Sequence, residues 1–265
     1  MALLSSTSVT GTGTVVFDDR PTAKVRYKLN GFAVPSVTTF IKAGLPTSEQ
    51  LIGWKIGKGA EFAHDNVNKF PRENVIKAAK AAWKTSTEEA QGVGVAIHSY
   101  AELSSLGKHE EALAELQKSK DSPQWDEILS AAHKVDEFMA QNNDVMLHTE
   151  AIVASSKHGF AGRFDRLVRR GGYTIMSDFK TSKSFYVEQF IQDAAYAIAV
   201  EEWLDIKVNA FEVIRFGKVG GDFKQLLITE PQEVARLKAQ ALRCLDTYNE
   251  IKLWSKDERF KYAKS

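Results

Sequence analysis

The sequence predicts an α+β protein, an α/β sandwich in which helices flank a central mixed β-sheet. Three observations support this fold class: helical periodicity in the first half, three short strand patterns joined by turns, and a later helix followed by further strands. Strand patterns joined by short turns are typical of an antiparallel meander. Helices that precede and follow such a meander are typical of an α+β fold.

The N-terminal region predicts a hairpin followed by helices. The segments "TVVF" (14–17) and "KVRYKL" (24–29) are rich in β-branched and aromatic residues, and "DDRPTA" between them has the composition of a turn. Helical spacing of apolar residues then extends from Ser36 to about Lys120, and again from Ser122 to about residue 141. We expect a hairpin and helical region over 1–90, packed on a core over 91–265.

The second half predicts the sheet and its covering helices. Three continuous strands are expected at 145–154, 160–168 and 173–179, separated by the turns "SSKHG" and "RRGG". The remaining elements are a helix over 187–203, strands around "AFEVIRF" and "KQLLITE", and a closing helix with Pro231 in its first turn.

Composition excludes several classes of site. The 265 residues include a single cysteine, Cys244, so an internal disulfide, a four-cysteine zinc site and an iron–sulfur cluster are all excluded. No apolar run is long enough for a spanning helix, and the first residues lack a secretory signal. We therefore expect a soluble, cytoplasmic protein without membrane contact, in the host cell if a phage encodes it.

Positive charge is concentrated in one stretch, although the net charge is only +1. Between residues 157 and 183, seven cations stand against two anions, Asp165 and Asp178. The cations are Lys157, Arg163, Arg166, Arg169, Arg170, Lys180 and Lys183. Such a cluster is usually a solvated face, but it can also bind a polyanion.

Three acids fall on the three expected strands, namely Glu150, Asp165 and Asp178. Neighbouring strands lie about 4.8 Å apart, so acids at matching heights can converge on one cation. Because side chains alternate along a strand, Asp178 and Lys180 should project on the same face. An isolated pair of this kind is usually a surface ion pair. Beside a metal, however, the lysine could orient a water or offset phosphate charge.

These residues resemble the motifs of the PD-(D/E)XK nucleases, and within them the RecB-like exonuclease branch. "GFAGRFD" resembles the segment carrying the first metal-binding aspartate, although Phe164 replaces the usual proline, and "DFK" (178–180) resembles the (D/E)XK motif. "QDAAY" (192–196) and "GVAIH" (94–98) resemble the branch's glutamine–tyrosine and histidine motifs. "VPSVTTFI", from Val34, is similar to a segment of mitochondrial genome-maintenance exonucleases and related phage nucleases.

The resemblance implies a restriction-endonuclease-like core and a role for each matching residue. It implies one or two Mg²⁺ or Mn²⁺ ions held by His98, Glu150, Asp165, Asp178 and the carbonyl of Phe179. Catalytic roles are implied for Asp165, Asp178, Lys180, Gln192 and Tyr196, although Tyr196 could equally be a core residue. We expect substrate phosphates to contact Arg163, Arg166, Thr181, Ser182 and Lys183.

The activity implied is metal-dependent exonuclease cleavage of single-stranded DNA or duplex ends, in DNA replication, recombination or repair. Partners would then be DNA and replication or recombination proteins. A structure-specific endonuclease built on the same site is one alternative. A catalytically inactive nucleic-acid-binding adaptor is another, although the complete Asp165, Asp178 and Lys180 set argues against it.

Overall fold

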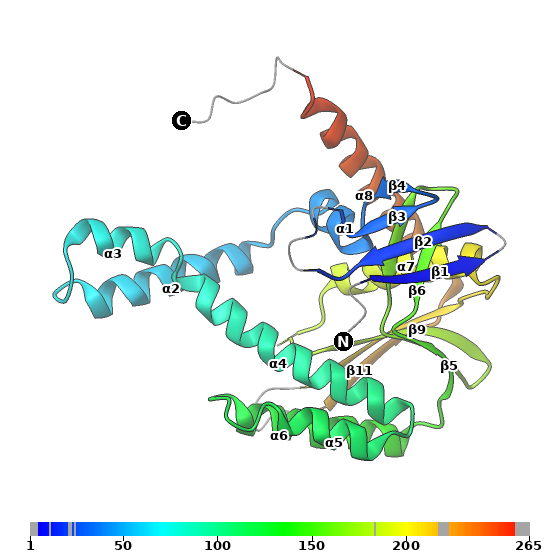
Figure 1. Cartoon of the computed structure of the whole chain (residues 1–265), viewed down its shortest axis with the longest axis horizontal. Helices are drawn as coiled ribbons and strands as arrows, with labels where there is room; N and C mark the ends of the chain where they lie inside the picture. Colours follow the sequence, from blue (N-terminus) through cyan, green and yellow to red (C-terminus); the bar gives the residue numbers. More distant parts are fainter. Residues whose placement is uncertain are drawn as a thin grey trace.

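A five-stranded mixed sheet lies at the centre of the structure, a computed structural model that describes residues 5–10, 12–20, 23, 25–182, 184–216 and 223–257 (Figure 1). The strand order is β11-β10-β9-β8-β5. Only β9 and β10 pair in parallel, and the other pairs are antiparallel. The bounds are β5 (Val145–Thr149), β8 (Arg166–Arg170), β9 (Tyr173–Lys180), β10 (Ala210–Phe216) and β11 (Phe223–Ile228).

Helices cover both faces of this sheet. Met176 and Val213 bury against α7 (Val187–Trp203), whereas Phe179 and Ile214 bury against α4 (Ala82–Ser105) and α6 (Trp125–Gln141). The α7 helix is apolar on nearly every side because α1 (Val37–Gly44) and α8 (Pro231–Trp254) pack on it opposite the sheet. A short helix, α5 (His109–Gln117), packs on α4. The predicted mixed sheet flanked by helices is confirmed.

The N-terminal residues form a small antiparallel sheet of four strands, with the order β1-β2-β3-β4. The pairing of β2 with β3 agrees with the expected hairpin, whereas the outer strands were not predicted. Val15, Phe17 and Leu29 bury in the same apolar core as α7. The bounds are β1 (Ser5–Thr10), β2 (Gly13–Asp18), β3 (Tyr27–Leu29) and β4 (Phe32–Val34).

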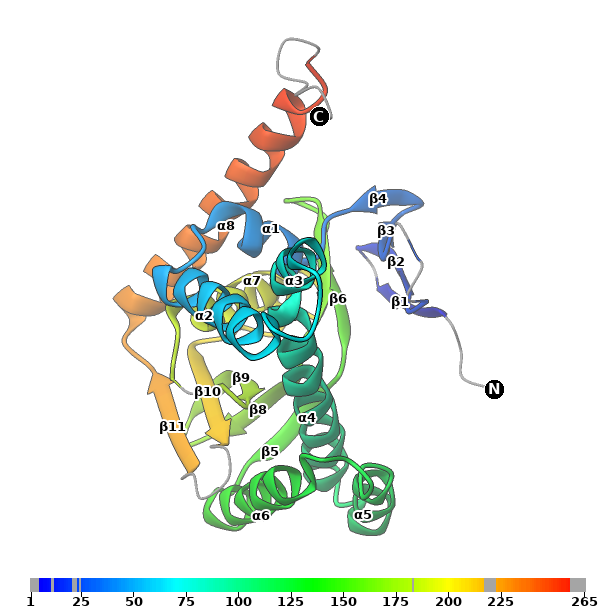
Figure 2. The same ribbon diagram turned by 90° about the vertical axis from the view of Figure 1, so that its left-hand side faces the viewer.

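Two helices, α2 (Glu49–Asn66) and α3 (Arg72–Ala79), form an arm that projects from the core (Figure 1). Ser48 begins α2, since its hydroxyl accepts a hydrogen bond from the Leu51 N–H at 3.2 Å. Figure 2 shows α4 running from this arm to α5 and α6. Residue 90 lies inside α4, and the division at that residue stays a prediction. None of the helices in the described ranges has the length and apolar character needed to cross a membrane.

The prediction of two continuous strands before β9 is wrong. The first breaks into β5 and β6 (Ile152–Ser155), and the second into β7 (Phe160–Arg163) and β8. β5 pairs with β8 in the central sheet, whereas β6 and β7 pair with each other. Glu150 lies in the first break with a left-handed backbone (φ 48°), and Asp165 lies in the second. Asp165 is therefore not inside a strand, as the sequence suggested.

The close packing of β7 on α7 predicts that Gly162→Ala destabilises the protein. A Cβ at residue 162 would lie 2.5 Å from Cε1 of Tyr196 and 3.0 Å from Cγ2 of Val37. We expect a loss of about 1–3 kcal/mol in the free energy of unfolding, measured by urea denaturation. Gly57→Ala is the matched control, because no atom lies within 4 Å of a Cβ there. Equal stability of the two variants would contradict the packing argument.

Candidate active site

Asp165 lies at the break between β7 and β8, so its side chain does not follow the alternation of side chains along a strand. Its Oδ2 accepts a hydrogen bond from the backbone N–H of Phe179, with N and O 3.2 Å apart. Its backbone carbonyl accepts from the Glu150 N–H (3.0 Å) and from the Thr149 hydroxyl (2.9 Å). The main chain thus fixes Asp165 while its carboxylate faces α4.

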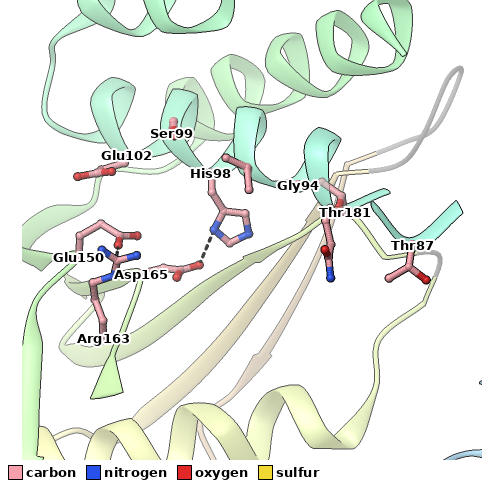
Figure 3. A pocket seen from close by; sticks show the side chains of 11 residues that line it. Thr87, Gly94, His98, Ser99, Glu102, Glu150, Arg163, Asp165 and Thr181 are labelled. Atoms are coloured by element: carbon pink, nitrogen blue, oxygen red, sulfur yellow. Dashed lines mark ion pairs between the residues drawn. The ribbon is translucent and has the colours of Figure 1, made fainter. Parts of the chain in front are cut away.

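His98 reaches Asp165 from α4. Nδ1 of His98 lies 3.1 Å from Oδ2 of Asp165 (Figure 3). Burial would lower the pKa of His98, but the Asp165 carboxylate outweighs it and raises the pKa above its usual value. Burial would likewise raise the pKa of Asp165, whereas His98 and Lys180 hold it well below its usual range. The Asp165 carboxylate therefore favours the protonated, charged form of His98.

Asp178 and Lys180 lie side by side on β9, as strand alternation predicted. The Lys180 ammonium forms an ion pair with Oδ2 of Asp178. Burial raises the pKa of Asp178 to about 7, even with Lys180 beside it. Burial would lower the pKa of Lys180, but the carboxylates of Asp178 and Asp165 outweigh it and raise the pKa. The pair is buried rather than a surface ion pair, since only 5% of the Asp178 side chain is exposed.

A third acid, Asp193 on α7, approaches the same pair. Its side chain is buried, and Oδ2 has no hydrogen-bond partner among the described atoms. Burial, together with the charge of Asp178, raises the pKa of Asp193 well above its usual value. Asp193 lies inside the quoted "QDAAY" segment, yet no role was predicted for it. The sequence signal that could have identified Asp193 is a carboxylate among the apolar residues of the α7 helix.

Glu150 forms an ion pair with Arg163, with Oε2 and Nε 2.9 Å apart (Figure 3). Burial and the neighbouring Asp165 raise the pKa of Glu150 to about 7. The Arg163 guanidinium also lies over the Phe17 ring of the N-terminal sheet, 5.4 Å from its centre. Glu102 lines the same cavity, and burial raises its pKa.

Gln192 and Tyr196 occupy one face of α7, one helical turn apart. Gln192 Nε2 donates to the Tyr196 hydroxyl at 3.3 Å. Tyr196 is buried, and burial raises the pKa of its hydroxyl well above the usual value. Its ring packs against Gly162, three residues before Asp165. These contacts place Tyr196 in the core, and the catalytic roles of Gln192 and Tyr196 both stay predictions.

Only part of the predicted phosphate-binding set faces the site. Arg163 and Thr181 line the cavity described below. Arg166 does not, because it is 1% exposed and its guanidinium forms an ion pair with Asp144, beneath the Phe138 ring of α6. The Ser182 hydroxyl donates to the Ser184 carbonyl at 2.8 Å. Lys183 lies outside the described residues.

A cavity of about 800 Å³ opens over Asp165. One wall is α4, from Thr87 to Glu102, and the other carries Glu150, Arg163 and Thr181 (Figure 3). Gly94 faces Thr181, where even a Cβ would make only ordinary contact at 3.7 Å. Asp178 and Lys180 are not part of its lining; Asp178 is buried and Lys180 is half-buried, both next to Asp165.

Comparison with known proteins identifies the family. The family model of the PD-(D/E)XK nuclease superfamily matches residues 64–256, well over half of the chain. The chain belongs to this superfamily. No curated protein matches the chain.

Two solved structures are similar to this PD-(D/E)XK chain at low identity. One, from Eubacterium rectale, bears the name "Putative exonuclease" and is 15% identical; the match covers 83% of this chain and 96% of that one, with a TM-score of 0.40. The other, named SSO0001, is also 15% identical, with 63% and 77% covered and a TM-score of 0.29. At TM-scores below 0.5, neither likeness carries an argument about fold or function.

PD-(D/E)XK nucleases generally use divalent metal ions, and the carboxylate oxygens of this site are the kind of donor that such ions prefer. The carboxylates of Asp165, Asp178 and Asp193 influence one another, with Lys180 and His98 as neighbouring cations, and burial raises the pKa of both Asp178 and Asp193. In the described ranges, no group of three or more histidine, cysteine, aspartate or glutamate side chains is spaced to hold a metal ion. Mg²⁺ commonly needs only one or two protein carboxylates besides water and substrate, which Asp165 and Asp178 would supply.

The contact between His98 and Asp165 predicts how Asp165→Asn changes the metal-free protein. Without the carboxylate, burial alone acts on the imidazole, so the pKa of His98 should fall, as measured by NMR titration. When the pKa of a histidine is higher in the folded than in the unfolded state, its protonation stabilises the fold. This contribution is complete at pH values below the pKa of the unfolded state, and it is lost as the pH rises through the pKa of the folded state. The variant should therefore lose up to about 2 kcal/mol more stability at pH 5.5 than at pH 9.

Asp126→Asn, at an exposed position of α6, is the control for that experiment. It should leave the pKa of His98 and the pH dependence of stability as in wild type. A His98 pKa that stays unchanged in Asp165→Asn would show that the two side chains do not interact in solution.

Proposed function

We propose that this protein is a metal-dependent DNA exonuclease that hydrolyses phosphodiester bonds of single-stranded DNA or duplex ends, in DNA replication, recombination or repair. Membership in a nuclease superfamily supports hydrolysis of nucleic acid. One observation carries the residue assignment: His98, Asp165 and the Asp178–Lys180 pair, from α4, a strand break and β9, meet at one place beside an open cavity.

The length of the cavity favours a polymeric substrate. Its lining along α4 extends from Thr87 to Glu102. At 1.5 Å per residue, this wall is about 22 Å long. Such a length accommodates several nucleotides of an extended strand and exceeds what a single small molecule requires. Arg163 on the opposite wall provides a cation for a phosphate next to the one that is cleaved.

Asp165 and Asp178 would hold the metal ion, with His98 as a further ligand or as the group that positions Asp165. A divalent cation held there would supply a lowered pKa for the attacking water and positive charge opposite the scissile phosphate. A second ion at Glu150 would have to displace Arg163, which pairs with that carboxylate. The structure therefore favours one principal ion, next to Asp165.

Lys180 would act on the phosphate directly. Its ammonium is fixed by Asp178, and 23% of the Lys180 side chain is exposed, so the ammonium would stabilise negative charge on the phosphate oxygens in the transition state. Water would attack phosphorus in line and lose one proton to solvent as the bond to the 3′ oxygen breaks, and the departing oxygen would take up one proton from solvent. A 5′ phosphate and a 3′ hydroxyl result. Gln192, on α7, would orient the water or the phosphate.

Removing Asp178 or Lys180 should abolish cleavage. Purified protein with Mg²⁺ or Mn²⁺ should degrade end-labelled DNA, and EDTA should stop it. Asp178→Ala and Lys180→Ala should each reduce kcat by at least about 10²-fold, since each removes charge stabilisation at the reacting phosphate. Circular dichroism would verify that both variants fold. Arg169→Ala, on an exposed residue of β8, should cleave like wild type. Wild-type rates in Asp178→Ala or Lys180→Ala would refute the site assignment.

The exonuclease mode predicts that free ends are required. Linear single-stranded DNA and linear duplex should be degraded from an end, whereas covalently closed circular DNA of the same sequence should stay intact. Gel electrophoresis of both forms in one reaction provides the measurement and its internal control. Cutting of the circle at a comparable rate would instead identify an endonuclease.

A further inference from the structure

Arg166 directly follows Asp165 in the sequence, but its side chain does not line the cavity over Asp165 and is instead buried against α6. It is the largest of the fully buried side chains in the described part of the chain, with 1% of its surface exposed. Its guanidinium forms an ion pair with Asp144, with Nη2 and Oδ2 2.6 Å apart. A buried charge of this size costs free energy unless it is fully paired. Its retention behind the candidate active site therefore requires an explanation.

Arg166 is one member of a closed ring of polar contacts. Its Nη1 donates to the Ser177 hydroxyl at 3.5 Å, and Ser177 donates to Glu212 at 2.9 Å. Arg170 completes the ring, because it forms ion pairs with both Glu212 and Asp144. Two arginines and two acids balance one another, so the ring carries no net charge. Its geometry is fixed from several strands at once, since its members come from β8, β9, β10 and the segment before β5.

Two aromatic rings enclose the Arg166 guanidinium. Its central carbon lies 5.3 Å from the centre of the Phe138 ring on α6 and 5.0 Å from that of Phe179 on β9. A planar guanidinium stacks on aromatic faces, which a lysine ammonium cannot reproduce. Because Phe179 packs on the Arg166 guanidinium, the polar contacts that hold Arg166 in place also hold the Phe179 side chain.

Phe179 connects this buried ring to the reacting groups. Its backbone N–H donates to Asp165, and its side chain makes an edge-on contact with the His98 ring, with centres 6.4 Å apart. It also stands between Asp178 and Lys180 in the strand. A shift of Phe179 would thus displace the carboxylate of Asp165 and the ring of His98 together.

We propose that Arg166 is a positioning residue that fixes the Phe179 peptide and, through it, the Asp165 carboxylate. Its effect on cleavage rests on the nuclease function proposed above. Its effect on Phe179 does not, and can be measured in the metal-free protein. Arg166 contacts neither the substrate nor the metal.

The test removes Arg166 without leaving a buried unpaired charge. The double variant Asp144→Asn with Arg166→Met takes away both partners of the ion pair, which buried pairs often tolerate. With ¹⁵N-phenylalanine labelling, exchange of the Phe179 amide hydrogen should accelerate at least tenfold relative to that of Phe211 in β10. Mn²⁺ affinity, measured by calorimetry, should fall at least tenfold. In cleavage assays kcat should fall, while the Kd for DNA in Ca²⁺ stays within twofold.

Arg169→Met is the matched control, since Arg169 lies on the same strand and is exposed. It should retain wild-type exchange, Mn²⁺ affinity and kcat. A folded double variant with wild-type Phe179 exchange and Mn²⁺ affinity would overturn the proposal. If the double variant does not fold, Arg166→Lys replaces it, because it keeps the charge but not the planar stack. Wild-type values in Arg166→Lys would then overturn the proposal equally.

The two proposals fail in different ways. If the wild-type protein cleaves no DNA with any divalent metal, the nuclease function is wrong, and the ratio of Phe179 to Phe211 exchange still decides the role of Arg166. If the wild type cleaves DNA but the variants show unchanged Phe179 exchange, only the positioning role is wrong.

Discussion

The hydrogen bonds accepted by the backbone carbonyl of Asp165 are the contacts on which the candidate site depends. They join Glu150 and Thr149 to Asp165 where two neighbouring strands leave the central sheet together. Without this junction, the Asp165 carboxylate would continue the alternation of a strand and would not face α4. A left-handed backbone at Glu150 is the conformational cost, of about 1 kcal/mol, and such strain is often found at functional sites.

Burial of like charges gives the site its chemical character. Asp178 and Asp193 both have raised pKa values because they are removed from water close to other carboxylates. Lys180 offsets only part of this repulsion. Buried carboxylates attract a bound cation more strongly than exposed ones, because solvent screens buried charges less. The same burial that destabilises the metal-free site would therefore favour the proposed metal ion.

Much of the fold follows from local patterns, but the break in the strands does not. The α7 and α8 helices agree with apolar periodicity and with Pro231, and strand alternation placed Asp178 beside Lys180. "VMLHTEAIVA" has the pattern of one strand, and nothing in it marks a left-handed residue, since that role usually falls to glycine or asparagine. Alternation does not relate Arg163 to Arg166, because the strand breaks between them. Only the tertiary structure shows that α6 covers the Arg166 side chain.

The N-terminal sheet contributes to the site although it lies far from it in the sequence. Phe17 on β2 supports the Arg163 guanidinium, and Arg163 in turn holds Glu150 at the cavity wall. Because Phe17 belongs to the same apolar core as α7, displacement of the small sheet would disturb both the core and this wall. The α4 helix likewise joins the projecting arm to His98. The site is therefore a product of the whole chain, and residues 91–265 alone would leave one wall without its support.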